Sequence, residues 1–371
     1  MNQVLTTTGT VNKLTIDTKA IQYNLKQIHS HLPPRTRVMA ILKSSGYGVQ
    51  DTVTLAETMS SFGIDLFGLA FTQEAIYLRE AGIQEELVVM NPLHDEAMLI
   101  AQYDLQPVVS DSDIIRLFSD TKQPLKVHLN INTGMNRLGC NPDEALYLAK
   151  MIDDDPNMIL QGAMTHFCSA DIQEQDTFTH QQIKDFESAL SEIKSHDIAI
   201  PWIHASNSPG TIRFCTPQFN LVRPGLAMYG IHLSECSNKV LPLKCALKLT
   251  SRLIGIHQCK KGETVGYGRT HCISQESALI GVIPLGYHDG IHRSYSNKAY
   301  VFINGAKAPL VGTICMDMTM VDVSQVPDVS VGDEVLIFGD ELPPGTFAKY
   351  GGTIAHELIS CLGPRIKRVF I

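Results

Sequence analysis

The sequence lacks several features that would assign a function class at once. Only 18% of its 371 residues are charged, and it has no long run of Lys or Arg. Because nucleic-acid binding needs a basic footprint, the formal charge of −8 argues against that class. No apolar stretch approaches the roughly 18 residues that a membrane span needs, and residues 1–17 lack the hydrophobic core of a signal peptide.

The nine cysteines are scattered and contain no CxxC pair. In a chain of this length, that pattern is typical of reduced thiols rather than of a disulfide framework or a zinc site. The chain also has no repeats or low-complexity tracts, which excludes a solenoid, and its 44% hydrophobic content excludes disorder. We therefore expect a soluble, cytoplasmic protein of about two domains, without a metal site.

The first two-thirds of the chain alternates short apolar runs with helical patterns. Near-continuous apolar runs are typical of strands buried on both faces. The eight expected strands are Val38–Lys43, Leu66–Ala70, Glu86–Met90, Leu105–Val109, Leu125–Thr133, Leu160–Phe167, Trp202–Ser206 and Leu221–Gly225. Asp17 and Asp51 precede apolar residues at helical spacing, Asn141-Pro142 opens another helix, and Thr177–His196 carries one apolar face.

Eight strand–helix units in about 215 residues predict a (β/α)8 TIM barrel. A doubly wound open sheet is the alternative. It usually has fewer strands and a Gly-rich turn after the first strand, and no G-x-G-x-x-G motif occurs there.

After about residue 244 the pattern changes to short alternating strands and tight turns. Asn304-Gly305 follows the apolar run Tyr300–Ile303 and predicts a two-residue hairpin, whose second arm Pro309 limits to an edge or an end. Residues 353–362 predict a short amphipathic helix. We expect a barrel over residues 1–244 and a mostly β domain over residues 245–371.

Reactive side chains in such a barrel lie at the C-terminal ends of the strands, and phosphate binds after strands 7 and 8. Lys43, Arg137, His166, Ser208 and Arg223 all occupy such positions. Taken singly, each has an ordinary structural interpretation, such as a solvated lysine or a core histidine. Lys43, however, closes a buried strand, where desolvation lowers the pKa of an amine and prepares it to condense with a carbonyl. A lysine beside phosphate donors, with no metal cluster, indicates pyridoxal phosphate.

Motifs along nearly the whole chain resemble those of the alanine racemases, a family of pyridoxal phosphate enzymes built from a barrel and a β domain. The matching segments occur in the order Lys43–Gly48, Asn132–Gly139, Thr165–Phe167 with Asp171, His204–Ser208, Arg223–Gly225 with Tyr229-Gly230, Gly266–Gly268, Gly286–Gly290, Cys315–Asp317 and Arg365–Arg368.

The resemblance implies an isomerase that interconverts L- and D-alanine, a reaction whose product commonly serves cell-wall synthesis. Lys43 would form the Schiff base with the cofactor and act as one acid–base group. Tyr267 would be the other, reaching into the barrel from the partner subunit of a homodimer. Racemisation removes a proton from one face of Cα and delivers it to the other, so two groups on opposite sides suit it.

The resemblance also implies roles for the other residues. Arg223 would face the pyridine nitrogen and leave it unprotonated, because arginine is a donor that stays charged. Arg137 would bind the cofactor ring oxygen and the substrate carboxylate, to which the backbone N–H of Met316 would also donate. A chain from Tyr267 through His166 to Arg223 would supply the cationic surroundings that a tyrosine base needs. The residues expected to bind the cofactor are Lys43, Tyr47, Arg137, His166, Asn207, Ser208, Arg223, Gly225, Leu226 and His356.

Four departures from the family pattern stand out. Asn130 stands where many members have a carbamylated lysine that braces Arg137, so another anion or water would fill the gap. Asn132 replaces a usual Asp, and Ser44-Ser45-Gly46 and Val49-Gln50 replace the usual Ala-Asn-Ala and His-Gly. His356 replaces a tyrosine at the substrate entrance, which predicts a roomier, more polar pocket and some activity on serine.

Other interpretations remain open. One is a racemase that prefers serine or accepts a broad range of amino acids. A decarboxylase of the same architecture would need an acidic residue at the pyridine nitrogen, where this sequence has Arg223. A non-catalytic pyridoxal phosphate-binding protein would lack the β domain, and a purely structural module would leave Lys43, His166 and Tyr267 coincidental.

Overall fold

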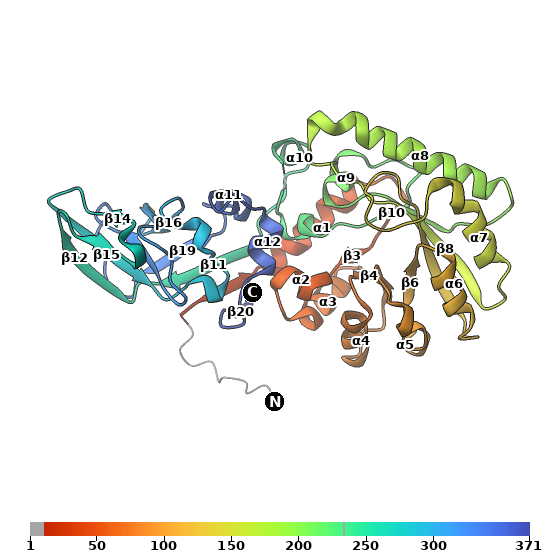
Figure 1. The fold of residues 1–371 in the computed structure, drawn as a ribbon, viewed down its shortest axis with the longest axis horizontal. Coiled ribbons are helices and arrows are strands. Elements are labelled where there is room, and N and C mark those ends of the chain that lie inside the picture. Colours follow the sequence, from red (N-terminus) through yellow and green to blue (C-terminus); the bar gives the residue numbers. More distant parts are fainter. Residues whose placement is uncertain (1–10, 233) are drawn as a thin grey trace.

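The computed structural model describes residues 11–232 and 234–371, and Figure 1 shows two parts joined side by side. The first part is a closed ring of eight parallel strand positions. Seven strands, β3 to β9, pair in chain order, and β2 pairs in parallel with β10. Met39 alone separates β2 from β3, so the two form one strand position. The barrel strands are β2 (Arg37–Val38), β3 (Ala40–Ile41), β4 (Leu66–Leu69), β5 (Glu86–Val89), β6 (Gln106–Val109), β7 (Leu125–Asn130), β8 (Met158–Met164), β9 (Trp202–His204) and β10 (Leu221–Val222).

The ring closes between β9 and β10, where the backbone N–H of Arg223 donates to the carbonyl of Ser206 at 2.8 Å. The expected (β/α)8 barrel is therefore confirmed, and its strands coincide with the eight apolar runs. Its interior and the faces beneath the helices form one continuous apolar core with the β domain.

The helices begin where the sequence has capping residues. The carboxylate of Asp17 accepts from the N–H groups of Lys19 and Ala20, and that of Asp51 accepts from Thr54. The helices are α1 (Thr18–His31), α2 (Lys43–Gly48), α3 (Thr52–Ser61), α4 (Thr72–Glu80), α5 (Ala97–Gln102), α6 (Ser112–Ser119), α7 (Ala145–Asp153), α8 (Asp176–Lys194), α9 (Ser208–Arg213), α10 (Glu235–Val240), α11 (Pro344–Tyr350) and α12 (Ala355–Ser360).

The C-terminal part is mostly β, as expected. A six-stranded sheet has the order β17-β16-β19-β11-β1-β20, a three-stranded sheet the order β12-β15-β18, and β13 pairs with β14. These strands are β1 (Lys13–Ile16), β11 (Leu247–Arg252), β12 (Gly255–Lys260), β13 (Thr264–Val265), β14 (His271–Cys272), β15 (Ser277–Ile283), β16 (Tyr300–Ile303), β17 (Ala306–Pro309), β18 (Thr319–Asp322), β19 (Glu334–Phe338) and β20 (Lys367–Phe370). The predicted hairpin is present, with Asn304 at φ 49° and Gly305 at φ 76° between β16 and β17.

The strand β1 lies in the C-terminal sheet, antiparallel to β11 and parallel to β20. From β1 onward the chain thus runs from the β part to the barrel and back. A division of the chain at residues 244 and 245 stays a prediction.

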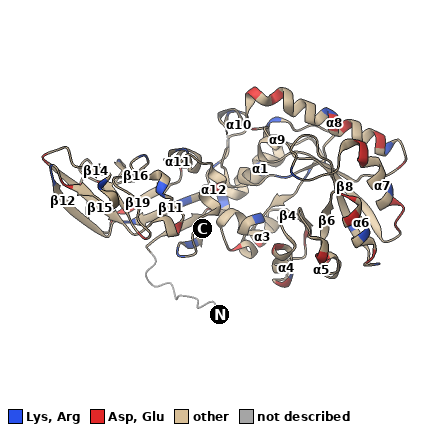
Figure 2. Cartoon of the chain, in the orientation of Figure 1, with Lys and Arg blue, Asp and Glu red and all other residues tan. Residues whose placement is uncertain are grey.

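Acidic side chains are prominent on the outer helices of the barrel, including α4 and α8 (Figure 2). Within the described residues, no helix combines the length and the apolar character that a membrane span requires.

Candidate active site

The first barrel strand ends in a left-handed helical turn. Ser44, Ser45, Gly46 and Tyr47 have φ between 54° and 64° and ψ between 39° and 49°. This conformation costs an L-residue roughly 1–2 kcal/mol, so surrounding contacts must hold it. The N–H of Gly46 donates to the carbonyl of Leu42 at 2.9 Å. The carboxylate of Glu74 accepts from the N–H groups of Ser44 and Ala70, which ties the turn to the next strand.

Lys43 is the first residue of this turn and is half-buried. Its ammonium has no hydrogen-bond or ion-pair partner among the described residues. Burial is the main cause that lowers the pKa of Lys43. The charges of Arg137 and Arg223 add to it, and Glu74 partly opposes it. The amine is therefore easier to deprotonate than a surface lysine.

Arg223 is buried on the same rim with no carboxylate against it in the described part of the chain. Its Nη1 lies 2.9 Å from Nδ1 of His204, and Nη2 donates to the carbonyl of Thr165 at 2.8 Å. Burial and then the charge of Arg137 lower the pKa of Arg223 to about 9, so it remains a cation at neutral pH.

The protonated nitrogen of His166 follows from these contacts. Nη2 of Arg223 lies 3.2 Å from Nδ1 of His166 and can only donate, so Nδ1 accepts and the hydrogen sits on Nε2. Nδ2 of Asn207 lies 3.4 Å from that Nε2 but donates to the carbonyl of Phe167 at 2.9 Å. Burial, followed by the charge of Arg223, lowers the pKa of His166 to about 3, so the ring is neutral. Its Nε2–H is left to donate at the rim.

A cluster of hydrogen-bond donors adjoins Lys43 and is suited to an anion. Oγ of Ser208 accepts from the N–H groups of Gly225 and Ala227 at 2.8 and 3.2 Å. Ser208 and Leu226 are the first residues of α9 and of the 3-10 helix η4 (Leu226–Tyr229), where an N–H has no intrahelical acceptor.

Tyr47 and His356 complete this cluster. A Cβ at Gly225 would lie 2.1 Å from Oη of Tyr47, so the hydroxyl reaches the backbone only because residue 225 is glycine. The Tyr47 hydroxyl has no hydrogen-bond partner among the described residues. Nδ1 of His356 is buried without a partner there as well, and the two rings lie 6.0 Å apart. Unused donors around a small space fit a phosphate group.

Two of the expected site residues lie elsewhere in the same chain. Tyr267 begins the 3-10 helix η5 (Tyr267–Arg269) between β13 and β14 and is 72% exposed. Met316 precedes β18 and is 52% exposed. In Figure 1, β14 lies at the far end of the β part, well away from α2. One chain therefore brings together Lys43, Tyr47, His166, Asn207, Ser208, Arg223, Gly225, Leu226 and His356, with the exposed Arg137 close enough for its charge to act on Lys43 and Arg223.

Three further residues position the site in ways that the sequence did not predict. Glu74 and Arg368 hold the turn after Lys43, and the carboxamide of Asn132 accepts from the N–H groups of Gly134 and Asn136 and shapes the loop that carries Arg137. Asn132 and Arg368 lie in the segments that resemble the family, but the contacts that they make were not predicted.

The barrel, its rim lysine and the adjoining anion cluster define an enzyme of the barrel-plus-β-domain class. Two domain models match, "Alanine racemase, N-terminal domain" over residues 16–233 and "Alanine racemase, C-terminal domain" over residues 246–370. The chain belongs to the alanine racemase family, and the racemase class expected from the sequence is confirmed.

Full-length relatives support this assignment. An alanine racemase of Desulfovibrio desulfuricans is 34% identical over 362 residues, covering 96% of this chain and 97% of the relative. One of Treponema denticola is 35% identical, covering 95% and 96%. The crystal structure of alanine racemase from Bacillus anthracis with bound L-Ala-P has a TM-score of 0.89 and 30% identity, covering 98% of this chain and 95% of that chain. That from Streptomyces lavendulae has a TM-score of 0.91 and 26% identity, covering 98% of both.

Proposed function

We propose that the protein interconverts L- and D-alanine with pyridoxal phosphate, using Lys43 of one subunit and Tyr267 of the partner subunit. The barrel, residues 1–244, would bind the cofactor, and residues 245–371 would contribute the second base. The observation that carries the proposal is the unpaired, half-buried amine of Lys43 beside an anion cluster and a buried arginine.

The residues of the rim fit this cofactor. The phosphate would be held by Tyr47, Ser208, Gly225, Leu226 and His356. Nδ1 of His356 has no hydrogen-bond partner among the described residues, and the N–H of Gly225 donates only to the hydroxyl oxygen of Ser208 there. When bound, pyridoxal phosphate supplies an aldehyde for an amine and a conjugated ring that stabilises negative charge at the substrate Cα.

Arg223 and His166 would set the electrostatics of the site. Arg223, protonated at neutral pH, would donate to the pyridine nitrogen and also to Nδ1 of His166, which fixes that ring at the cofactor site beside Asn207. Because Arg223 makes Nδ1 of His166 an acceptor, Nε2–H would donate to the phenol oxygen of Tyr267 of the partner subunit. That donation stabilises the phenolate form, which is the form able to take a proton.

Two groups would then move the proton at Cα. Lys43 would take or give it on one face, and the lowered pKa of its amine favours the neutral form that takes the proton. Tyr267 of the partner subunit would serve the opposite face. Arg137 and the backbone N–H of the partner subunit's Met316 would hold the substrate carboxylate, which fixes the orientation of Cα between the two bases.

The composite site can be tested with two inactive variants. Lys43→Ala and Tyr267→Phe should each abolish racemisation alone. If the subunits exchange, an equal mixture contains heterodimers with one intact and one doubly altered site, so about a quarter of wild-type activity should return. A mixture that exchanges subunits but stays inactive would show that both bases act within one chain.

A second candidate function is a racemase that prefers serine or other polar side chains. It is favoured by Nδ1 of His356, a buried nitrogen without a partner that is able to bind a substrate hydroxyl. Cα-proton exchange in D2O, followed by NMR for L-alanine and L-serine, separates the candidates. Faster exchange on alanine with appearance of D-alanine supports the proposal. Bound cofactor without any exchange would instead identify a non-catalytic binding protein.

A further inference from the structure

A column of polar side chains, buried except at its half-buried last member, crosses the barrel interior from Arg223 to the opposite mouth. Nε2 of His204 lies 3.0 Å from Nδ1 of His128, and Nε2 of His128 lies 3.0 Å from Oε1 of Gln106. The amide of Gln106 donates to the carboxylate of Glu86. His204 ends β9 at the active-site rim, whereas Gln106 and Glu86 begin β6 and β5 at the other end. We call His204, His128, Gln106 and Glu86 the interior column.

The chemistry of arginine fixes the direction of every hydrogen bond in the interior column. Arg223 can only donate, so Nδ1 of His204 accepts and its hydrogen sits on Nε2. That N–H donates to Nδ1 of His128, which leaves the hydrogen of His128 on Nε2 to donate to Gln106. Each group therefore turns its acceptor toward Arg223 and its donor toward Glu86. Aligned in this way, the dipoles stabilise a positive charge at Arg223.

Packing holds this arrangement in place. The side chains of His128 and His204 are fully buried, and their rings meet nearly at right angles, at 82°. A Cβ at Gly162 would lie 2.4 Å from Nδ1 of His128, so β8 leaves room for the ring only through a glycine. Burial lowers the pKa of His128 to about 3 and that of His204 well below its usual range, so both rings stay neutral.

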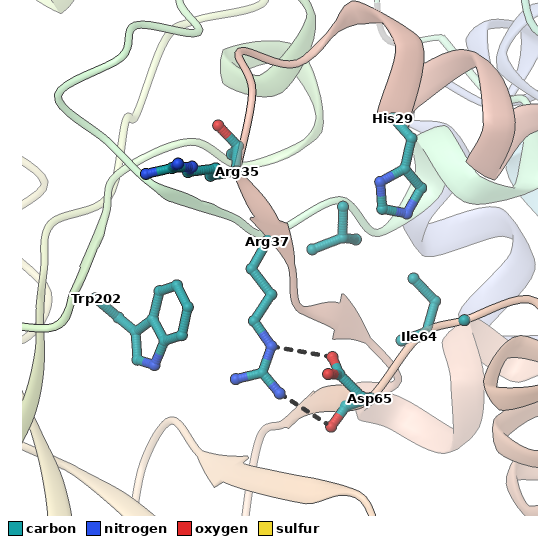
Figure 3. A pocket seen from close by; sticks show the side chains of 9 residues that line it. His29, Arg35, Arg37, Ile64, Asp65 and Trp202 are labelled. Atoms are coloured by element: carbon teal, nitrogen blue, oxygen red, sulfur yellow. Dashed lines mark hydrogen bonds and ion pairs between the residues drawn. The ribbon is translucent and has the colours of Figure 1, made fainter.

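The column ends on an ionised carboxylate. Glu86 pairs with Nη2 of Arg37 at 2.7 Å, and Arg37 also contacts Asp65, with Nε 3.0 Å from Oδ1. Figure 3 shows Arg37, Asp65 and Trp202 around an open pocket of about 310 Å³ at this mouth. Burial opposes ionisation of Glu86. The hydrogen bonds from Gln106 and Arg37 outweigh it and lower the pKa of that carboxyl.

We propose that the interior column is a positioning device for the active site, which fixes His204 as the acceptor for Arg223 and stabilises the charge of Arg223 through aligned dipoles and Glu86. The buried Arg223 has no adjoining carboxylate in the described structure, and the column links it to one. The proposal rests on the proposed function in one respect only, namely that Arg223 faces the pyridine nitrogen of the cofactor. None of the four column residues touches substrate, so they act through Arg223.

Charge removal at the far mouth tests this coupling. Glu86→Gln keeps the shape of the side chain and an acceptor for Gln106 but removes the charge. Asp65→Asn is the control, because it removes the other carboxylate charge that contacts Arg37 and lies outside the interior column. Lys43, Arg137, His166 and His204 face Arg223 and are unchanged in both variants, as is Lys126 near Glu86. In the holoenzyme, Glu86→Gln should move the alkaline limb of kcat/KM for alanine down by about half a pH unit, and Asp65→Asn should leave it in place. Equal profiles for the two variants would overturn the proposal.

A second measurement does not depend on catalysis. In protein labelled with 15N-histidine, His128 and His204 should both show the neutral tautomer with hydrogen on Nε2 between pH 6 and about pH 9. The signals are assigned from their loss in His128→Asn and His204→Asn. A hydrogen on Nδ1 of either ring would overturn the column, even if the enzyme racemises alanine. An inactive wild-type protein with the expected tautomers would instead refute the proposed function and leave the column intact.

Discussion

The guanidinium of Arg368 donates to the carbonyl of Gly48, at 3.3 Å from Nε and 3.0 Å from Nη2. Arg368 lies in β20 of the C-terminal part, and Gly48 ends the left-handed turn that starts at Lys43. The same guanidinium also donates to the carbonyls of Leu362, Gly363 and Ile366. One side chain thus holds the end of the lysine turn against the C-terminal part, and this contact lies within a single chain.

Arg368→Lys should therefore weaken both stability and catalysis. A lysine keeps the charge but cannot serve carbonyls in the planar fork of a guanidinium. We expect a loss of about 1–3 kcal/mol in the free energy of unfolding, from carbonyls left unpaired. We also expect roughly a tenfold loss in kcat/KM as the turn relaxes. Arg252→Lys is the matched control, since exposed Arg252 donates, within the described part of the chain, only to the carbonyl of Gly332 in the β part. Equal effects in the two variants would contradict a special role for Arg368.

Gly225→Ala should reduce cofactor binding. The added methyl would meet Oη of Tyr47 at 2.1 Å, so either the hydroxyl or the loop that carries the anion cluster must move. We expect cofactor affinity, followed by absorbance titration of the apoenzyme, to fall at least about tenfold. Gly255→Ala is the control, because its Cβ would meet only the tip of His257 at 3.7 Å. In Gly225→Ala, the further change Tyr47→Phe removes the hydroxyl contact but leaves the ring carbon Cζ 2.7 Å from the added methyl, so it should recover only part of the lost stability and none of the phosphate affinity.

The buried histidines should make the protein sensitive to mild acid. His128, His166 and His204 have folded pKa values far below 6.5 because of burial. Below pH 6.5 the unfolded chain binds protons that the native state does not, so stability falls as pH falls. Each ring contributes about 1.4 kcal/mol per pH unit once its unfolded form is protonated. Urea unfolding at pH 5, 6 and 7 should show a slope smaller by one proton in His128→Asn than in wild type. An unchanged slope would mean that His128 titrates normally.

The local sequence pattern was sufficient to predict the strands, the helix caps at Asp17 and Asp51 and the hairpin at Asn304-Gly305, because neighbouring residues determine each of these features. It also placed Lys43 and Arg223 at strand ends. It did not reveal the left-handed turn, since the contacts that hold Ser44 and Gly48 come from Glu74 and from the distant Arg368.

The interior column was missed for a similar reason. His128 and His204 are 76 positions apart, and only barrel closure brings their rings together. The membership of β1 in the C-terminal sheet likewise depends on pairing with Thr250 and Lys367, far along the chain. Contacts of this kind leave no periodic signal in the sequence.

His356 should widen the substrate range toward serine. Burial and then the charge of Lys43 lower the pKa of His356, and the charge of Asp171 partly opposes them, so the ring is neutral. Its Nδ1 has no partner among the described residues and is able to hydrogen-bond a substrate hydroxyl. A tyrosine is longer and would fill that space. We expect His356→Tyr to lower the serine-to-alanine ratio of kcat/KM by roughly tenfold. His356→Phe separates size from polarity, because it adds a ring without a hydrogen-bonding group. A fall in both variants indicates filled space, a fall in His356→Phe alone indicates the lost hydrogen bond, and an unchanged ratio in both contradicts the prediction.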